Sequence, residues 1–199
     1  QGNTYYNLTI QNSGTKTQQS DLVVLGDLTI NGPMASGNFD LNVGGDWTNS
    51  SVFTEGSGTV TLDGSGDQQI SNPAVEVFNN LIISKSAGTL SLLDNVTVNN
   101  VLTMNSGTVD AGSSILMLGT GTGNTGTLSH TTGWILGRFK RWIDVAGSLD
   151  FPVGNSNFYT PAAITFNTLP TGGSLTTEFI STNPGNNGLG DLRPFIAFG

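Results

Sequence analysis

The sequence predicts an all-β fold made of stacked repeats, a parallel β-helix or β-solenoid, on three observations. Charged residues make up only 10% of the chain, far below the roughly 25% of an ordinary globular domain. Gly, Asn, Ser and Thr, which favour turns and strands, are abundant, whereas the helix-forming Glu, Lys, Arg and Gln are scarce. Short alternating runs recur, and similar strings return at a regular spacing. We therefore expect almost no helix.

Alternation of apolar and polar residues predicts the individual strands, because side chains of a half-buried strand point to opposite faces in turn. Clusters of Gly, Asn, Asp and Ser separate the runs and supply turn chemistry. The predicted strands cover residues 6–10, 27–30, 38–43, 59–62, 78–83, 95–98, 101–104 and 114–118.

Internal repetition predicts how these strands are arranged. Asn7-Leu8-Thr9-Ile10 returns as Asp27-Leu28-Thr29-Ile30, and Gly26-Asp27-Leu28-Thr29 returns as Gly45-Asp46-Trp47-Thr48. The spacing of about 19–20 residues is that of a short solenoid coil, which buries its apolar face only against neighbouring coils. The leucines expected at inward positions of this spacing are Leu8, Leu28, Leu62, Leu81 and Leu102.

A β-sandwich stays open as an alternative, because it also has short alternating strands with turn signals roughly every 8–12 residues. The composition of the sequence changes after Gly133, where Trp134 and a run of basic residues begin. We expect solenoid repeats over residues 1–132 and a small C-terminal β cap or sandwich-like module over residues 133–199. A cap is required because the last coil would otherwise expose apolar surface and unpaired strand edges.

Charge and composition narrow the functional classes. The net charge of −8 repels phosphate backbones, so nucleic acid is not an expected partner. Without cysteine, disulfides and thiolate metal sites are excluded. No apolar run approaches the roughly 20 residues of a membrane helix, so membrane insertion is not expected. The first residues lack the features of a signal peptide, and we expect the numbering to begin inside a mature chain.

Few residues are candidates for catalysis. His130 is the only histidine, and its Ser and Thr neighbours predict an exposed turn. Asp63 with Asp67, and Asp144 with Asp150, form the local acid pairs that glycoside hydrolysis would need. Acids are common in Gly-rich turns for backbone reasons, so we predict that the protein is not an enzyme and keep polysaccharide cleavage as the alternative.

One turn resembles the start of a calcium loop, because Asp63, Ser65 and Asp67 place oxygen atoms at alternate positions. Gln68 stands where an EF-hand loop has Gly, and Ala74 stands where it has its bidentate Glu. A plain turn is the preferred interpretation. No cofactor is expected, with calcium as the weak candidate.

Aromatic and basic side chains suggest two further sites. Trp47, Trp134, Trp142 and Tyr159 are candidates for a sugar-stacking platform, although aromatic side chains in strands more often belong to the core. The run Arg138-Phe139-Lys140-Arg141-Trp142 interleaves basic and aromatic residues as single-stranded nucleic-acid sites do. In so acidic a chain we interpret this run as an inter-domain contact that pairs with Asp144 or Asp150.

Several strings resemble repeat modules of very large secreted proteins of the Bacteroidetes that are exported by the type IX secretion route. These strings are YYNLTI, VGGDWTNSSVFTEGSGTVTLDGSGDQQI and VFNNLIIS, within about residues 5–119. Gly137 to Arg141 followed by FPVGNSNFYTPAAITF resembles the module that often follows those repeats. The resemblance thus extends over nearly the whole chain.

The resemblance implies a right-handed β-helical stalk in an adhesin-like or filament-like protein, located outside the cell or on its surface, with no catalytic residues. The predicted function is a non-catalytic structural or adhesive module, with a polysaccharide-binding or polysaccharide-cleaving β-helix as the alternative. Expected partners are neighbouring domains of a larger chain, a second copy stacked end to end, or surface glycans.

Overall fold

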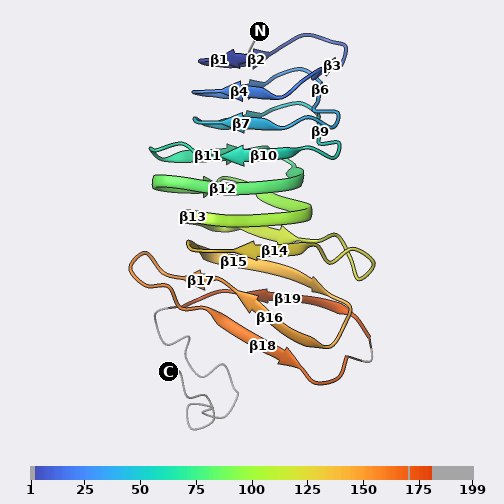
Figure 1. Cartoon of the computed structure of the whole chain (residues 1–199), viewed down its shortest axis with the longest axis vertical. Helices are drawn as coiled ribbons and strands as arrows, with labels where there is room; N and C mark the ends of the chain where they lie inside the picture. The colour runs from blue at the N-terminus through green and yellow to red at the C-terminus, as the bar shows by residue number, and fades with distance from the viewer. Residues whose placement is uncertain (1–2, 170, 181–199) are drawn as a thin grey trace.

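The computed structural model describes residues 3–169 and 171–180. Over these residues the chain consists of strands and connecting turns without helix, and the strands stack as a parallel β-solenoid of about eight turns (Figure 1). The predicted solenoid is confirmed, and the β-sandwich alternative is not adopted.

Each of the first three coils carries three short strands, separated by the turns that the sequence predicts. The first coil holds β1 (Thr4–Tyr5), β2 (Leu8–Ile10) and β3 (Lys16–Thr17). The second holds β4 (Leu22–Val24), β5 (Leu28–Ile30) and β6 (Met34–Ala35). The third holds β7 (Leu41–Val43), β8 (Trp47–Asn49) and β9 (Phe53–Thr54).

The next coils have longer strands. β10 (Thr59–Leu62) and β11 (Gln68–Ser71) form the fourth coil. β12 (Val75–Leu92) pairs with both of them, so this one strand bends around two faces of the solenoid. β13 (Asn95–Leu118) follows the same path below it, with register shifts at the bends. The corners that are irregular turns in the first three coils are therefore replaced by bent but continuous strand in β12 and β13.

Strand pairing confirms the short repeat. Leu8 lies opposite Leu28, and Leu28 lies opposite Trp47. The leucines at the predicted spacing lie on two faces, however, because Leu81 and Leu102 belong to the neighbouring face, and Leu62 lies opposite Ile83. The spacing also widens at the next step of the first column, where Trp47 lies opposite Ile70. A fixed interval counted along the sequence therefore reaches residues on different faces of the solenoid.

The core occupies the inside of the coils. Leu28 and Leu102 are 0% exposed and Leu81 is 1% exposed, whereas Leu8 on the first coil is half-buried. Each fully buried leucine contributes about 1.5–3 kcal/mol relative to an exposed one. Trp47 contacts Phe53 and Phe78 edge to face, with centroids 4.9 and 5.1 Å apart. The three rings fill one corner of the solenoid.

Outside the core, Asn and Asp side chains join successive coils in a row that we call the Asx ladder. Asn7 Oδ1 accepts a hydrogen bond from the backbone N–H of Asp27 at 2.8 Å, and Asp27 Oδ1 accepts one from Asp46 at 2.9 Å. Asp46 Oδ1 in turn accepts from the backbone N–H of Gln69 at 3.0 Å. A second row of the same kind runs through Asp21, Asp40 and Thr59. The acids at the corners thus satisfy backbone donors of the next coil.

One corner accommodates an insertion. β14 (Thr127–His130) pairs with Val101–Met104 of β13, so the chain between these partners is longer than in the earlier coils. The extra residues form a tight turn in which Gly121 and Asn124 pair. Strand pairing resumes in register on both sides of the turn, so the insertion leaves the stack unchanged.

Parallel stacking continues beyond the expected boundary at residues 132 and 133. β15 (Trp134–Ile143) pairs with β13 as far as Arg141 opposite Leu118, and β17 (Val153–Gly154) pairs with β15 in the same direction. Antiparallel pairing begins only with β16 (Gly147–Phe151), β18 (Ala162–Phe166) and β19 (Gly173–Thr177). These strands lie across the end of the stack (Figure 1). Residues 170 and 181–199 of the expected C-terminal module lie outside the described residues.

Candidate functional site

The four aromatic candidates occupy different environments. Trp47 is 0% exposed in the core, and its Nε1 donates to Glu76 at 2.9 Å. Trp142 is half-buried in β15 opposite Ser174 of β19, with Lys140 Nζ 4.9 Å from its ring centroid. Trp134 and Tyr159 come together at the end of the stack, and they form the site described next.

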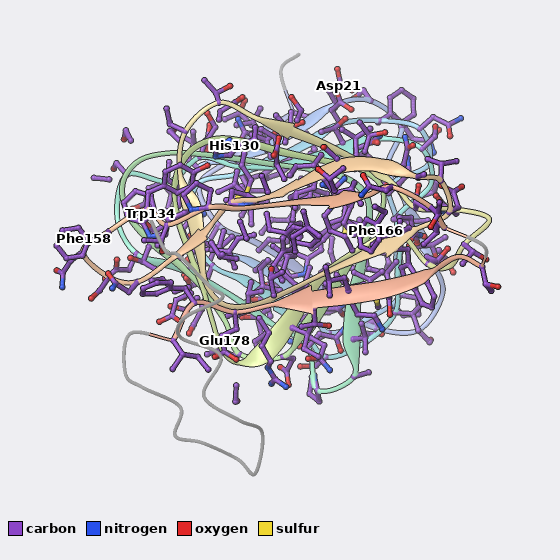
Figure 2. All side chains as sticks on the ribbon, turned by 90° about the horizontal axis from the view of Figure 1, so that it is seen from below. Asp21, His130, Trp134, Phe158, Phe166 and Glu178 are labelled. Atoms are coloured by element: carbon purple, nitrogen blue, oxygen red, sulfur yellow. The ribbon has the colours of Figure 1, made fainter. Side chains whose placement is uncertain are left out.

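A cluster of aromatic rings lies where the last coils meet the cap. The rings of His130 and Tyr159 stack at 5.7 Å with an interplanar angle of 26°, and Trp134 lies 6.2 Å from Tyr159. Figure 2 shows His130, Trp134 and Phe158 along one side of the molecule. Phe158 is 66% exposed and Tyr159 is 44% exposed. We call the three neighbouring rings of His130, Trp134 and Tyr159, together with Phe158 on the adjoining loop, the aromatic platform.

His130 does not lie in the expected turn. It ends β14, is half-buried, and places Nε2 2.8 Å from the carbonyl oxygen of Gly133. Its ring stacks on Tyr159, which follows β17 much later in the chain. The described contacts therefore fix the ring as part of the platform rather than orient it with a carboxylate.

A tight loop presents Phe158 and Tyr159. Asn155 Oδ1 accepts the backbone N–H groups of Asn157 and Phe158 at 2.8 Å each, and the Asn155 N–H donates to the Phe158 carbonyl at 2.9 Å. Asn is well suited to such side-chain-to-backbone turns. The Asn155 carbonyl also accepts Trp134 Nε1 at 2.9 Å. The loop and the indole therefore hold each other in place.

Gly154 makes this loop possible. A Cβ atom at this position would lie 2.3 Å from the Phe158 carbonyl oxygen and 2.9 Å from Trp134 Cδ1. Only glycine allows the loop to fold back so closely over the indole. The Phe-Pro-Val-Gly string thus joins the end of β16 to β17 and leads into the loop.

The calcium candidates lie exposed in the turn between β10 and β11. Asp63 Oδ2 accepts from Asn42 Nδ2 at 3.0 Å, and Asp67 Oδ1 accepts the backbone N–H of Thr89 at 2.9 Å. Ser65 is exposed between them. Both acids thus bond to neighbouring coils instead of converging on one point.

A lysine ammonium fills the inner side of that turn. Lys85 is 2% exposed, and its Nζ donates to the carbonyls of Gly64 and Gly66 at 2.9 and 2.7 Å and to Gln68 Oε1 at 2.8 Å. Burial lowers the pKa of Lys85, and the nearby aspartates oppose this shift. The backbone carbonyls that a calcium loop would offer are engaged by this built-in cation. Within residues 3–169 and 171–180, no three His, Asp or Glu side chains are placed to share a metal ion.

A buried carboxylate lies on the same long strand. Glu76 is 1% exposed, and its Oε2 accepts from Trp47 Nε1 and Asn49 Nδ2 at 2.9 Å each and from Asn72 Nδ2 at 3.2 Å. Burial raises the pKa of Glu76, while these hydrogen bonds act to lower it. Sequence reasoning overlooked Glu76 and Lys85. The alternation of inward residues, Glu76 with Phe78 and Lys85 with Ile83, was the signal for both.

The basic run lies at the junction between stack and cap. Arg141 is 8% exposed, its Nη1 donates to the Asp150 carbonyl at 2.8 Å, and its guanidinium lies 5.7 Å from the Phe151 ring centroid. Burial lowers the pKa of Arg141, and the charge of Asp150 partly offsets this. Arg141 therefore contacts Asp150 through the backbone, whereas Asp144 is exposed at the end of β15.

Comparisons with protein-family models, curated proteins and solved structures find no match for this chain. No helix in the described part of the chain has the length and hydropathy needed to cross a membrane.

Proposed function

We propose that this chain is a non-catalytic structural or adhesive module of a secreted or cell-surface protein, in which a stiff stack of coils holds binding parts away from their attachment. The observation that carries the proposal is the Asx ladder. It joins coil to coil through Asn7, Asp27 and Asp46, and it uses the exposed acids as acceptors for backbone donors. Carboxylates that serve the stack in this way are poor candidates for acid–base chemistry.

The family resemblance carries the cellular part of the proposal. The repeated strings resemble repeat modules of large Bacteroidetes proteins exported by the type IX route, and this resemblance suggests a stalk, adhesin or filament outside the cell. The low charge of the surface, with only 10% charged residues, suits such a role. Neighbouring domains of a larger chain, or a second copy stacked end to end, are the proposed structural partners.

A coil deletion tests the mechanical part of the proposal. Leu22 lies opposite Leu41, so removing residues 22–40 leaves Asp21 followed by a strand of the same inward pattern. Because coils couple mainly to their neighbours, the shortened protein should fold, with its long dimension reduced by one strand spacing of about 4.8 Å. Small-angle scattering measures the length, and circular dichroism measures the strand content. Loss of all β-structure on deletion would contradict the stacking mechanism.

Polysaccharide cleavage is the competing activity, and it has its own test. Neutral and acidic polysaccharides are incubated with the wild type and with the double variant Asp63→Asn, Asp67→Asn, with and without calcium. Reducing-end and unsaturated-product assays should detect no turnover. Product that appears with the wild type and disappears with the double variant would replace the structural proposal by an enzymatic one.

A further inference from the structure

We propose that the aromatic platform, formed by His130, Trp134, Phe158 and Tyr159, binds a neutral glycan chain. The first reason is exposure. Phe158 and Tyr159 are adjacent large apolar residues with 66% and 44% of their surface exposed. Exposed apolar side chains are ordinary when scattered singly, whereas a group of them surrounded by polar residues marks a binding surface.

The second reason is that the platform is organised before any ligand arrives. Its loop is closed by three hydrogen bonds within Asn155–Phe158. The backbone N–H of Thr160 donates to Val153 at 2.9 Å just outside the loop. Rings held in this way lose little conformational freedom on binding, so more of the contact energy appears as affinity.

The third reason is the chemistry of the surface. Aromatic side chains present flat apolar faces, and Tyr and His add polar edges. The loop that carries Phe158 and Tyr159 also contains Ser156 and Asn157, which are exposed and offer neutral donors and acceptors. A pyranose ring has the matching chemistry, since one face carries C–H groups and the rim carries hydroxyls. Stacking of a sugar on Tyr159, with hydroxyls bonded to the amides, would use both properties of the surface.

Charge selects among glycans. The Tyr159 hydroxyl has a raised pKa because it is partly buried and because the charge of Asp150 disfavours the phenolate. The same negative field would disfavour a uronate or sulfate, as would the net charge of −8. Two of the basic residues that follow Trp134 in β15 are engaged elsewhere, Arg141 with the Asp150 carbonyl and Lys140 over Trp142. The platform therefore fits a neutral glycan better than an acidic one.

This inference names the ligand class of the proposed adhesive module and rests on that proposal. Scattering measures the coil stack and sugar binding measures the platform. Failure of one measurement can therefore be told apart from failure of the other.

Affinity electrophoresis supplies the test. The full chain is run through gels that contain soluble neutral polysaccharides, namely laminarin, xyloglucan and galactomannan, and is sedimented with cellulose and chitin. Alginate and polygalacturonate serve as acidic comparisons. At least one neutral glycan should retain the wild type. Tyr159→Ala should weaken that binding at least about tenfold, the effect of removing an anchoring ring.

Two further variants make the result specific. Phe158→Ala removes a ring that is 66% exposed and should fold normally, so it tests the platform even if Tyr159→Ala disturbs the loop. Tyr6→Ala is the matched control, because Tyr6 is 76% exposed on the turn between β1 and β2 in the first coil. It should bind like the wild type. The proposal is overturned if no neutral glycan retains the wild type or if only acidic glycans do. It is also overturned if Tyr6→Ala weakens glycan binding as much as the platform variants do.

Discussion

Replacing Glu76 tests how the first residues of β12 are held inside the solenoid. Its Oε2 accepts three hydrogen bonds, from Trp47, Asn49 and Asn72, and the carboxylate is 1% exposed. Glu76→Ala leaves three buried donors without their acceptor. At the lower half of the range of about 1–3 kcal/mol per orphaned group, the loss for the three donors comes to about 3–6 kcal/mol. Relief of the buried charge offsets part of this loss.

Glu76→Gln is the matched variant, because it keeps the size of the side chain and one acceptor oxygen while removing the charge. Burial raises the pKa of Glu76 above the ordinary value of 4.5. Between that value and the folded pKa, the folded protein holds a proton that the unfolded chain has released. Unfolding therefore releases protons, and the free energy of unfolding falls as the pH rises through this window. The Gln variant has no such proton to release, so its stability relative to the wild type should increase as the pH rises.

Urea unfolding followed by circular dichroism measures these differences, at about pH 4, below the ordinary pKa of a glutamate, and again at about pH 8. The expected order at both values places Glu76→Ala well below Glu76→Gln. At the higher pH, the free energy of unfolding of Glu76→Gln should increase relative to that of the wild type. If the wild type gains on Gln as the pH rises, the carboxylate is stabilised by its surroundings in the charged form, and the reasoning fails.

Three further changes probe the stack. Leu81→Ala should lower the free energy of unfolding by about 2–5 kcal/mol, because it empties a core position that is 1% exposed, whereas Leu93→Ala, 53% exposed, should change it little. Equal effects in urea unfolding would contradict the assignment of the core. Lys85→Met keeps the apolar stem but removes three charge-assisted hydrogen bonds, and thermal unfolding should show a loss of about 1–3 kcal/mol. An unchanged melting temperature would mean that water replaces the ammonium. Asp27→Ala should cost about 1 kcal/mol by removing the acceptor for the Asp46 N–H, and Asp27→Asn should restore it. Failure of Asn to restore stability would show that charge, rather than hydrogen bonding, joins these coils.

Much of the fold could be predicted because repetition and alternation are local. The string from Asn7 to Ile10 and its copy from Asp27 to Ile30 predicted which residues pair, since stacked coils place equivalent residues opposite each other. The longer turn at residues 63–67 widens the step from Trp47 to its partner Ile70, and this could not be predicted from spacing alone. A count along the sequence does not reveal at which corner an insertion lies.

The candidate site could be predicted only in part. Trp134 and Tyr159 were singled out as aromatic side chains, but so was Trp47, which the core absorbs. Nothing local distinguishes the three residues. Their fate depends on contacts between residues far apart in sequence, such as the stacking of Tyr159 on His130. The same dependence explains why His130 was expected in an open turn.

The turn that holds Gly121 and Asn124 has a consequence for how such a protein can change. The residues that exceed the usual coil length form a turn at one corner, and Thr127–His130 after this turn still pairs in register with Val101–Met104 of the preceding coil. Loops confined to the surface in this way tolerate replacement far better than strands do. This corner is therefore a natural grafting point, where a new recognition loop could arise by insertion, or be placed by design, without any compensating change in the scaffold.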